Sequence, residues 1–151
     1  MKYLIVFILL FPSVCFSQPK DMAEFQKMMA EIQRSHIEGN VPREADFGIF
    51  LERDLEAYFS SFGKNITLKY QLLRDGPTQS GVSYPKYYVW VQVFEGSNIV
   101  QEGAARVAAI EKQRFEVFNF LSKSSLLENP NSAAQVFPVA LLAKISQLSG
   151  V

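Results

Sequence analysis

The chain has 151 residues, and its 15 Lys and Arg residues balance 15 Asp and Glu residues. This neutral charge, with no dominant basic run, argues against nucleic-acid binding, and one His and one Cys are too few ligands for a structural zinc site. Hydrophobic residues make up 48% and aromatic residues 13%, which indicates one packed domain, and we expect no metal, no cofactor and no nucleic-acid partner.

Residues 1–17 have the order of segments that is typical of a secretory signal peptide. Lys2 supplies a positive charge, residues 4–11 are apolar without a break, and Ser17 offers a small residue at a cleavage site. The apolar run is shorter than the roughly 20 residues of a membrane span. We expect cleavage near Ser17 and export to the bacterial periplasm, which would leave no disulfide and no stable membrane span. Secretion, or an envelope lipoprotein anchored through Cys15, is the alternative.

Residues 18–41 are predicted to form an amphipathic helix and a linker that precede the domain. The apolar residues of this helix recur at i, i+3, i+7 and i+10 in one narrow stripe, which consists of Met22, Phe25, Met29 and Ile32. Two interpretations stay open. The helix packs on its own domain, or it docks to a partner, because Met side chains suit adaptable binding surfaces. We take these four residues as candidates for partner binding.

Residues 42–151 are expected to form a single α+β domain. Pro42 opens a long core helix that ends at Gly63, where a glycine favours helix termination. Asp54 interrupts its apolar face, which otherwise consists of Phe47, Phe50, Leu51, Leu55, Tyr58, Phe59 and Phe62. A helix near the C-terminus, from about Pro138 to Leu148, is expected to cover the other side of a sheet.

The segment between these helices has the composition of β-strands. The connections at Gly96-Ser97 and Lys112-Gln113 are short, which predicts a four-stranded antiparallel meander. A long loop at 75–85, rich in Gly, Pro and Ser, separates the first two strands. The predicted strands are 65–74, 87–95, 99–110 and 115–121.

The two short turns also predict the strand register. The first turn would pair Phe94 with Ile99, Trp90 with Gly103 and Tyr87 with Arg106. The second turn would pair Ile110 with Phe115 and Arg106 with Asn119. One face would then carry Val89, Val91, Val93, Val100, Ala104, Ala108, Ile110, Phe115, Val117 and Leu121. The other face would carry Tyr88, Trp90, Phe94, Val107, Phe118 and Phe120.

In this register, polar side chains gather at one end of the first face. They are Tyr87, Glu102, Arg106 and Asn119, and the helix residues Asp54 and Tyr58 would point toward them. A buried charge needs a partner, so one interpretation is an ion pair of Arg106 with Asp54 or Glu102. The alternatives are a pocket for a small anion or polar ligand, and acid–base chemistry by Asp54 and Tyr58. No catalytic residue is assigned, because the sequence carries no nucleophile elbow and no phosphate loop.

A helix followed by a four-stranded antiparallel sheet, over roughly residues 42–121, resembles the cystatin-like and nuclear-transport-factor-2-like folds. The resemblance rests on element order. Such families include periplasmic inhibitors, immunity proteins, binding modules and some enzymes, and the cystatin inhibitory loop signature does not occur here. The resemblance implies binding rather than catalysis. Together with the predicted signal peptide, the missing catalytic motifs, the Met-rich helix and the loop at 75–85, it leads us to expect a non-enzymatic, exported binding protein that recognises another protein, for example as an inhibitor or immunity-type partner. The alternative is a small-ligand pocket protein or an enzyme that uses a cavity between the long helix and the sheet.

Overall fold

The computed structural model describes residues 22–151, so the predicted signal peptide and Cys15 lie outside the described residues. The chain has the predicted α+β fold, in which four strands form an antiparallel sheet in the order β1-β2-β3-β4. The strands are β1 (Ile66–Leu72), β2 (Lys86–Glu95), β3 (Asn98–Ile110) and β4 (Arg114–Ser122). The helices are α1 (Met22–Asn40), α2 (Glu44–Phe59), a 3₁₀ turn η1 (Ser60–Phe62), α3 (Lys123–Glu128), α4 (Ser132–Val136) and α5 (Val139–Ser149).

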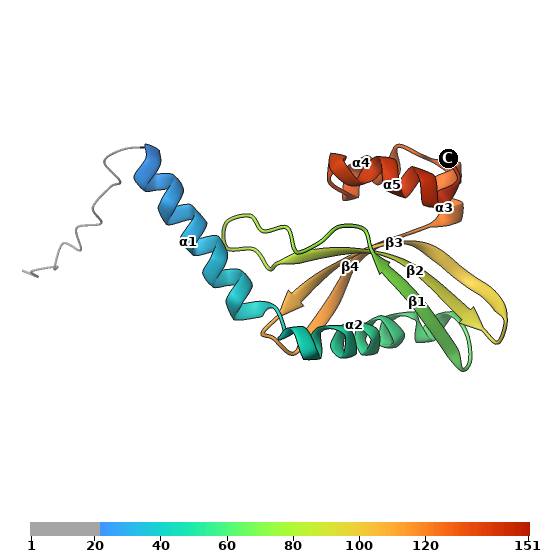
Figure 1. Cartoon of the computed structure of the whole chain (residues 1–151). Helices are drawn as coiled ribbons and strands as arrows, with labels where there is room; N and C mark the ends of the chain where they lie inside the picture. The colour runs from blue at the N-terminus through green and yellow to red at the C-terminus, as the bar shows by residue number, and fades with distance from the viewer. Residues whose placement is uncertain (1–21) are drawn as a thin grey trace, which may run out of the picture.

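Helices cover both faces of the sheet (Figure 1). The α2 face is the side against which α2 packs, and its buried residues include Leu51, Leu55, Phe59, Val89, Val91, Val93, Ala105 and Val107. The α5 face is the opposite side, under α3, α4 and α5, and its buried residues include Tyr88, Trp90, Ala104, Leu126, Phe137, Leu141 and Ile145. The sheet is therefore the middle of three layers, which is why its strands are apolar on both sides.

Helix α2 confirms the predicted core helix. Leu51, Leu55 and Phe59 are fully buried, and their spacing of four residues places them on one side of the helix. Phe47, one turn earlier, packs edge to face on Phe115, with 5.0 Å between ring centroids. The prediction was wrong for Tyr58 and Phe62, which are 41% and 42% exposed, and α2 ends at Phe59 rather than at Gly63, with the 3₁₀ turn η1 following it.

The hairpin between β2 and β3 confirms the predicted turn but corrects the register beyond it. Phe94 pairs with Ile99 as expected, and a register shift then leaves Val100 without a partner on β2. Beyond the shift, Trp90 lies opposite Ala104 rather than Gly103. Tyr87 likewise lies opposite Val107 rather than Arg106. One extra residue in a strand reverses the side to which every later side chain points.

The turn between β3 and β4 begins one residue earlier than predicted. Ile110 pairs with Arg114 rather than Phe115, and a second shift at Phe118 restores the predicted pair of Arg106 with Asn119. Because of the two shifts, several residues of β3 and β4 lie on the face opposite to the predicted one. Ala104 and Leu121 belong to the α5 face, whereas Val107 and Phe120 belong to the α2 face.

The C-terminal segment forms three short helices rather than one. The predicted helix is α5, and Leu141 and Ile145 are its buried residues. Helix α3 is capped by Ser122, whose Oγ accepts a hydrogen bond from Ser125 N at 3.1 Å. Helix α4 has no counterpart in the prediction.

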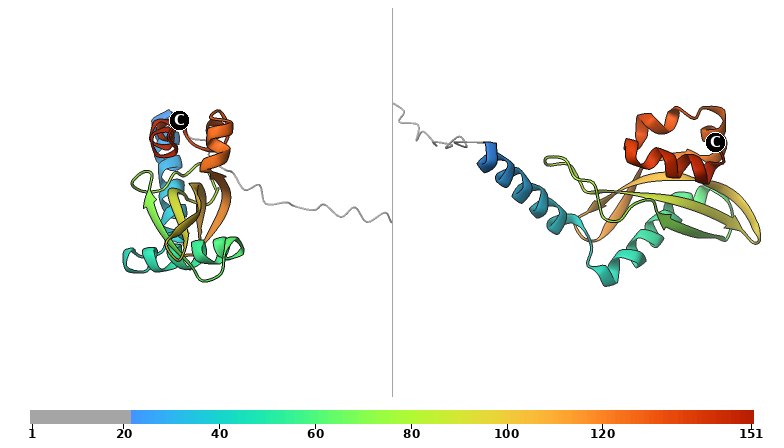
Figure 2. Two further views of the ribbon diagram at one scale, coloured as in Figure 1. Left: turned by 90° about the vertical axis from the view of Figure 1, so that its right-hand side faces the viewer. Right: turned by 45° about the horizontal axis from the view of Figure 1, so that its top comes forward.

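Helix α1 extends away from the rest of the fold in Figure 1 and in the right-hand view of Figure 2. None of its 19 residues is buried. The interpretation in which this helix packs on its own domain is therefore not supported. Over residues 22–151, no helix combines the length and the apolar character that crossing a bilayer requires.

Candidate functional site

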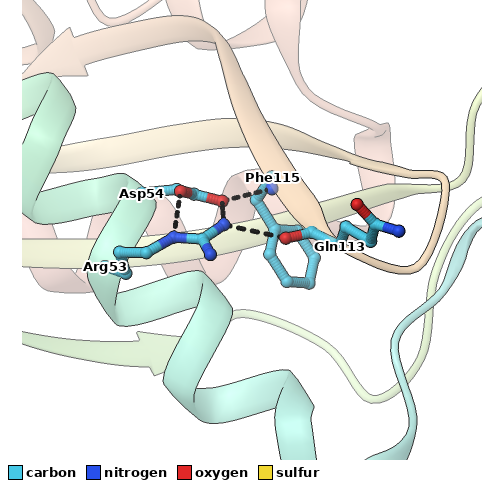
Figure 3. Close-up of polar contacts among 4 residues, drawn as sticks. All are labelled: Arg53, Asp54, Gln113 and Phe115. Atoms are coloured by element: carbon cyan, nitrogen blue, oxygen red, sulfur yellow. Dashed lines mark hydrogen bonds and ion pairs between the residues drawn. The ribbon is translucent and has the colours of Figure 1, made fainter.

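Asp54 and the adjacent Arg53 bind the backbone where the β3–β4 turn leads into β4 (Figure 3). Asp54 Oδ2 accepts a hydrogen bond from Phe115 N at 2.6 Å. Arg53 donates from Nε to Asp54 Oδ1 at 2.8 Å, and from Nη2 both to Asp54 Oδ2 at 3.0 Å and to Gln113 O at 2.8 Å. The hydrogen bond from Arg53 to Asp54 raises the pKa of the Arg53 guanidinium. The carboxylate in the apolar stripe thus satisfies a strand N–H, and it joins α2 to the turn.

The turn itself has an unfavourable backbone conformation. Glu111 and Lys112 have φ values of 52° and 61°, in the left-handed region that costs a side-chain-bearing residue about 1 kcal/mol or more. Asn40, the last residue of α1, offsets part of this backbone cost through two hydrogen bonds with the turn. Its O accepts from Lys112 N at 2.8 Å, and its Oδ1 accepts from Glu111 N at 3.1 Å. The end of α1 and the middle of α2 therefore hold the same turn.

Glu102 is the hub of a separate polar cluster on the α5 face. Its Oε1 accepts from Gln92 Nε2 at 2.8 Å and from Trp90 Nε1 at 3.2 Å, and its Oε2 accepts from Lys123 Nζ at 3.1 Å. Burial by itself would raise the pKa of the Glu102 carboxyl. The hydrogen bonds from Gln92, Lys123 and Trp90, together with the charge of Lys123, outweigh burial and lower the pKa below its usual value.

An open hollow of about 270 Å³ lies beside this cluster, between the sheet and the end of α5. Lys69, Gln71 and Leu148 form part of its lining, together with Gln92 and Glu102. The carboxylate oxygens already receive three hydrogen bonds from the protein. The cluster joins β2, β3 and the start of α3, and it has the character of a structural hub.

Arg106 and Asn119 are neighbours across β3 and β4, as predicted, but on the α5 face. Arg106 Nη1 donates to Val136 O in α4 at 3.3 Å. Within residues 22–151, Arg106 forms no ion pair, and buried Arg106 Nε and Asn119 Oδ1 have no hydrogen-bond partner. The predicted ion pair of Arg106 with Asp54 or Glu102 does not form, because Asp54 contacts β4 from the α2 face and Glu102 pairs with Lys123.

The structure therefore divides the predicted polar cluster into three parts. Tyr87 lies in the core of the α2 face, with its ring centroid 4.8 Å from that of Phe47, and burial raises the pKa of its hydroxyl. Asp54 holds the turn, and Tyr58 is half-exposed. Glu102, Arg106 and Asn119 lie on the opposite face of the sheet. The error follows from the register shift at Val100, which moved the even-numbered residues of β3 to the other side.

Sequence reasoning did not identify Asn40, Arg53 or Lys123 as partners in these clusters. Asn40 carried a signal, since an Asn at a helix end can satisfy nearby backbone groups. Arg53 and Lys123 carried none, because exposed basic residues are common, and Gln113 and Glu102, to which they donate, lie far along the chain.

The candidate partner-binding residues lie on α1. Met22 is 70% exposed and Phe25 is 44% exposed, whereas Met29 and Ile32 are partly exposed. Met28, on the same side of the helix, is also exposed. This apolar surface has no partner within residues 22–151 that buries it.

Comparison of the chain with models of protein families, with characterised proteins and with solved structures gave no match. Function must therefore be argued from the chain's own residues.

Proposed function

We propose that this chain is an exported protein of the bacterial periplasm that binds another protein without catalysis, as an inhibitor or an immunity protein does. The observation that carries the proposal is α1, a 19-residue helix that extends from the fold without one buried residue. Large apolar side chains on such a helix, Met22 and Phe25 above all, are typical of a surface that a partner covers.

The surroundings of the polar residues favour binding over acid–base chemistry. Both carboxylate oxygens of Asp54 already accept hydrogen bonds, from Arg53 and Phe115. The space between α2 and the sheet, where a catalytic or ligand cavity was the alternative, is packed with fully buried side chains such as Leu55 and Val91. A cavity of that kind would need Asp54 and Arg106 on the same side of the sheet, and they lie on opposite sides.

The test is capture of the target by the chain from envelope extracts, followed by a binding measurement with the purified target. Phe25→Ser and Ile32→Ser should abolish binding, because both remove apolar surface from α1. The matched control is Ile49→Ser on α2, which removes a side chain that is 65% exposed. The proposal fails if no protein is captured, or if the α1 variants and the control bind the target equally.

Export is tested separately. The mass of the chain purified from cells should correspond to cleavage near Ser17, and the protein should appear in the periplasmic fraction. A mass that includes residues 1–17, or a lipid attached at Cys15, would contradict this part of the proposal.

A further inference from the structure

We propose that α1 pairs with α1 of a second copy of this chain, as a short two-stranded coiled coil. The inference rests on the proposed use of α1 as a protein-binding helix: a second copy occupies the stripe, and a target has to displace it from the same residues. The residues along its exposed stripe are Met22, Phe25, Met29, Ile32 and His36, at alternating spacings of three and four. This is the 3.5-residue period of a coiled-coil seam, which is narrower than the face that a helix turns toward a globular core.

None of the charged residues of α1 lies in this seam or at the positions that flank it. The positions that flank the stripe are occupied by uncharged residues: Gln26, Met28, Gln33 and Ser35. The charged residues are on the opposite side of the helix and are Glu24, Lys27, Glu31, Arg34 and Glu38. Arg34 and Glu38, for example, pair with each other along the helix at 3.8 Å. A stripe flanked by uncharged residues can pair with its own copy without like-charge repulsion, and it does not require a partner of opposite charge.

Two other partners for the stripe, the chain's own domain and a membrane surface, agree less well with the structure. The chain's own domain does not cover the stripe, because no residue of α1 is buried. A membrane surface is disfavoured by charge, since three acidic residues against two basic ones give the polar side of α1 a net charge of −1. Helices that lie on anionic membranes carry Lys and Arg on that side. Helix α1 projects from the fold (Figure 2), and the stripe is accessible to a second helix because no residue of α1 is buried.

The attachment of α1 makes pairing of the whole protein feasible. Asn40 fixes the end of the helix to the β3–β4 turn through two hydrogen bonds, so the helix keeps a defined direction relative to the sheet. A helix held at one end loses less freedom on pairing than a flexible segment would.

The experiment measures the mass of the chain, purified with its native N-terminus, by sedimentation from micromolar to millimolar concentration. Wild type should reach the mass of a dimer. Met29→Glu and Met29→Lys each place two like charges in the seam and should raise the dissociation constant by roughly a hundredfold. Lys27→Glu, on the charged side, is the control and should keep the dimer. Circular dichroism checks that each variant remains folded, which is expected because Met29 is not buried.

Mixing the two Met29 variants provides the decisive test. If the helices pair in parallel, the mixture should recover the dimer, since the introduced carboxylate and ammonium groups then face each other across the seam. If they pair antiparallel, Phe25 or Ile32 of the second copy lies opposite Met29, so the single-chain variant M29E with F25K or M29E with I32K should recover it instead. A monomer at every concentration, a dimer that the seam charges do not weaken, or no rescue by any of these combinations overturns the inference. A monomer that still captures a target refutes only the pairing, whereas a dimer without a target refutes only the proposed function.

Discussion

Replacing Asp54 with Ala should strongly destabilise the fold, because Asp54 is the acceptor for the backbone N–H of a buried strand residue. Phe115 is 5% exposed, and its N–H lies 2.6 Å from Asp54 Oδ2, measured from the nitrogen. A hydrogen bond to a charged group contributes about 1.5–3 kcal/mol, and a buried donor left without an acceptor costs a similar amount. We therefore expect the free energy of unfolding to fall by about 2–3 kcal/mol.

Two further variants separate the hydrogen bond from the charge. Asp54→Asn keeps an acceptor for Phe115 N and loses the ion pair with Arg53, so it should cost about 1 kcal/mol, clearly less than Ala. Asp46→Ala is the matched control, since Asp46 is also on α2 and pairs with Arg43 at 2.8 Å near the surface. It should change stability by less than about 0.5–1 kcal/mol.

The free energy of unfolding of all three variants is measured by urea denaturation at neutral pH, with the fluorescence of Trp90 as the signal. Thermal denaturation should agree, with a midpoint for Asp54→Ala that is about 6–9 °C lower at roughly 3 °C per kcal/mol. If Asp54→Ala is as stable as Asp46→Ala, the carboxylate does not support the turn. Its place in the apolar stripe would then need a functional explanation.

Three shorter predictions concern the sheet and its turns. Lys112→Gly should stabilise the protein by about 1 kcal/mol in urea denaturation, because glycine adopts a φ of 61° without the steric cost of a side chain; a loss of stability would contradict the assigned turn. Gly103→Ala should cost about 3 kcal/mol or prevent folding, since its Cβ would collide with Leu121 O and lie 2.9 Å from the Phe120 ring. Because its pKa is lowered on folding, Glu102 should contribute stability above its ordinary pKa of about 4.5 that is lost as pH falls through the folded pKa. The difference between wild type and Glu102→Gln, measured from pH 7 to pH 3, should therefore shrink toward acid pH, over about the range in which carboxyl groups titrate.

The architecture could be predicted because it depends on local patterns. The apolar spacing of α2, the glycine turn at Gly96 and the repeated antiparallel connections each produce a signal within a few residues. These signals specify the helix, the hairpin and the meander without knowledge of any distant contact.

The register could not be predicted, because the shifts at Val100 and Phe118 leave no mark in the sequence. Both are ordinary hydrophobic residues in apolar strands. A single unpaired residue nevertheless decides whether Arg106 meets Asp54 or Val136. A turn was predicted near Lys112, but the left-handed backbone of Glu111 and Lys112 was equally hidden, since the turn contains none of the Gly or Asn residues that favour it.

Asp54 illustrates the limit of reasoning from charge. Its place in an apolar stripe correctly indicated that it needs a partner, and Arg106 was the nearest candidate by charge. The partner is instead a backbone N–H together with the adjacent Arg53. Every residue except proline carries the same backbone N–H donor, so sequence alone does not distinguish the one at Phe115 from the others.

The β3–β4 turn connects the stability of the domain to the presentation of α1. Asp54 and Arg53 bind it from α2, and Asn40 binds it from α1, so a strained backbone segment is held from two directions. Replacing Asn40 with Ala would remove the contact of its Oδ1 with Glu111 N but keep the contact of its backbone O with Lys112 N, so it would loosen the base of α1 while leaving the exposed stripe chemically unchanged. Asn40→Ala should therefore weaken pairing of α1 less than Met29→Glu does, because it disturbs the direction of the helix and not the seam. Helix α1 is therefore fixed at its C-terminal end, and the exposed stripe along the rest of the helix is available for pairing.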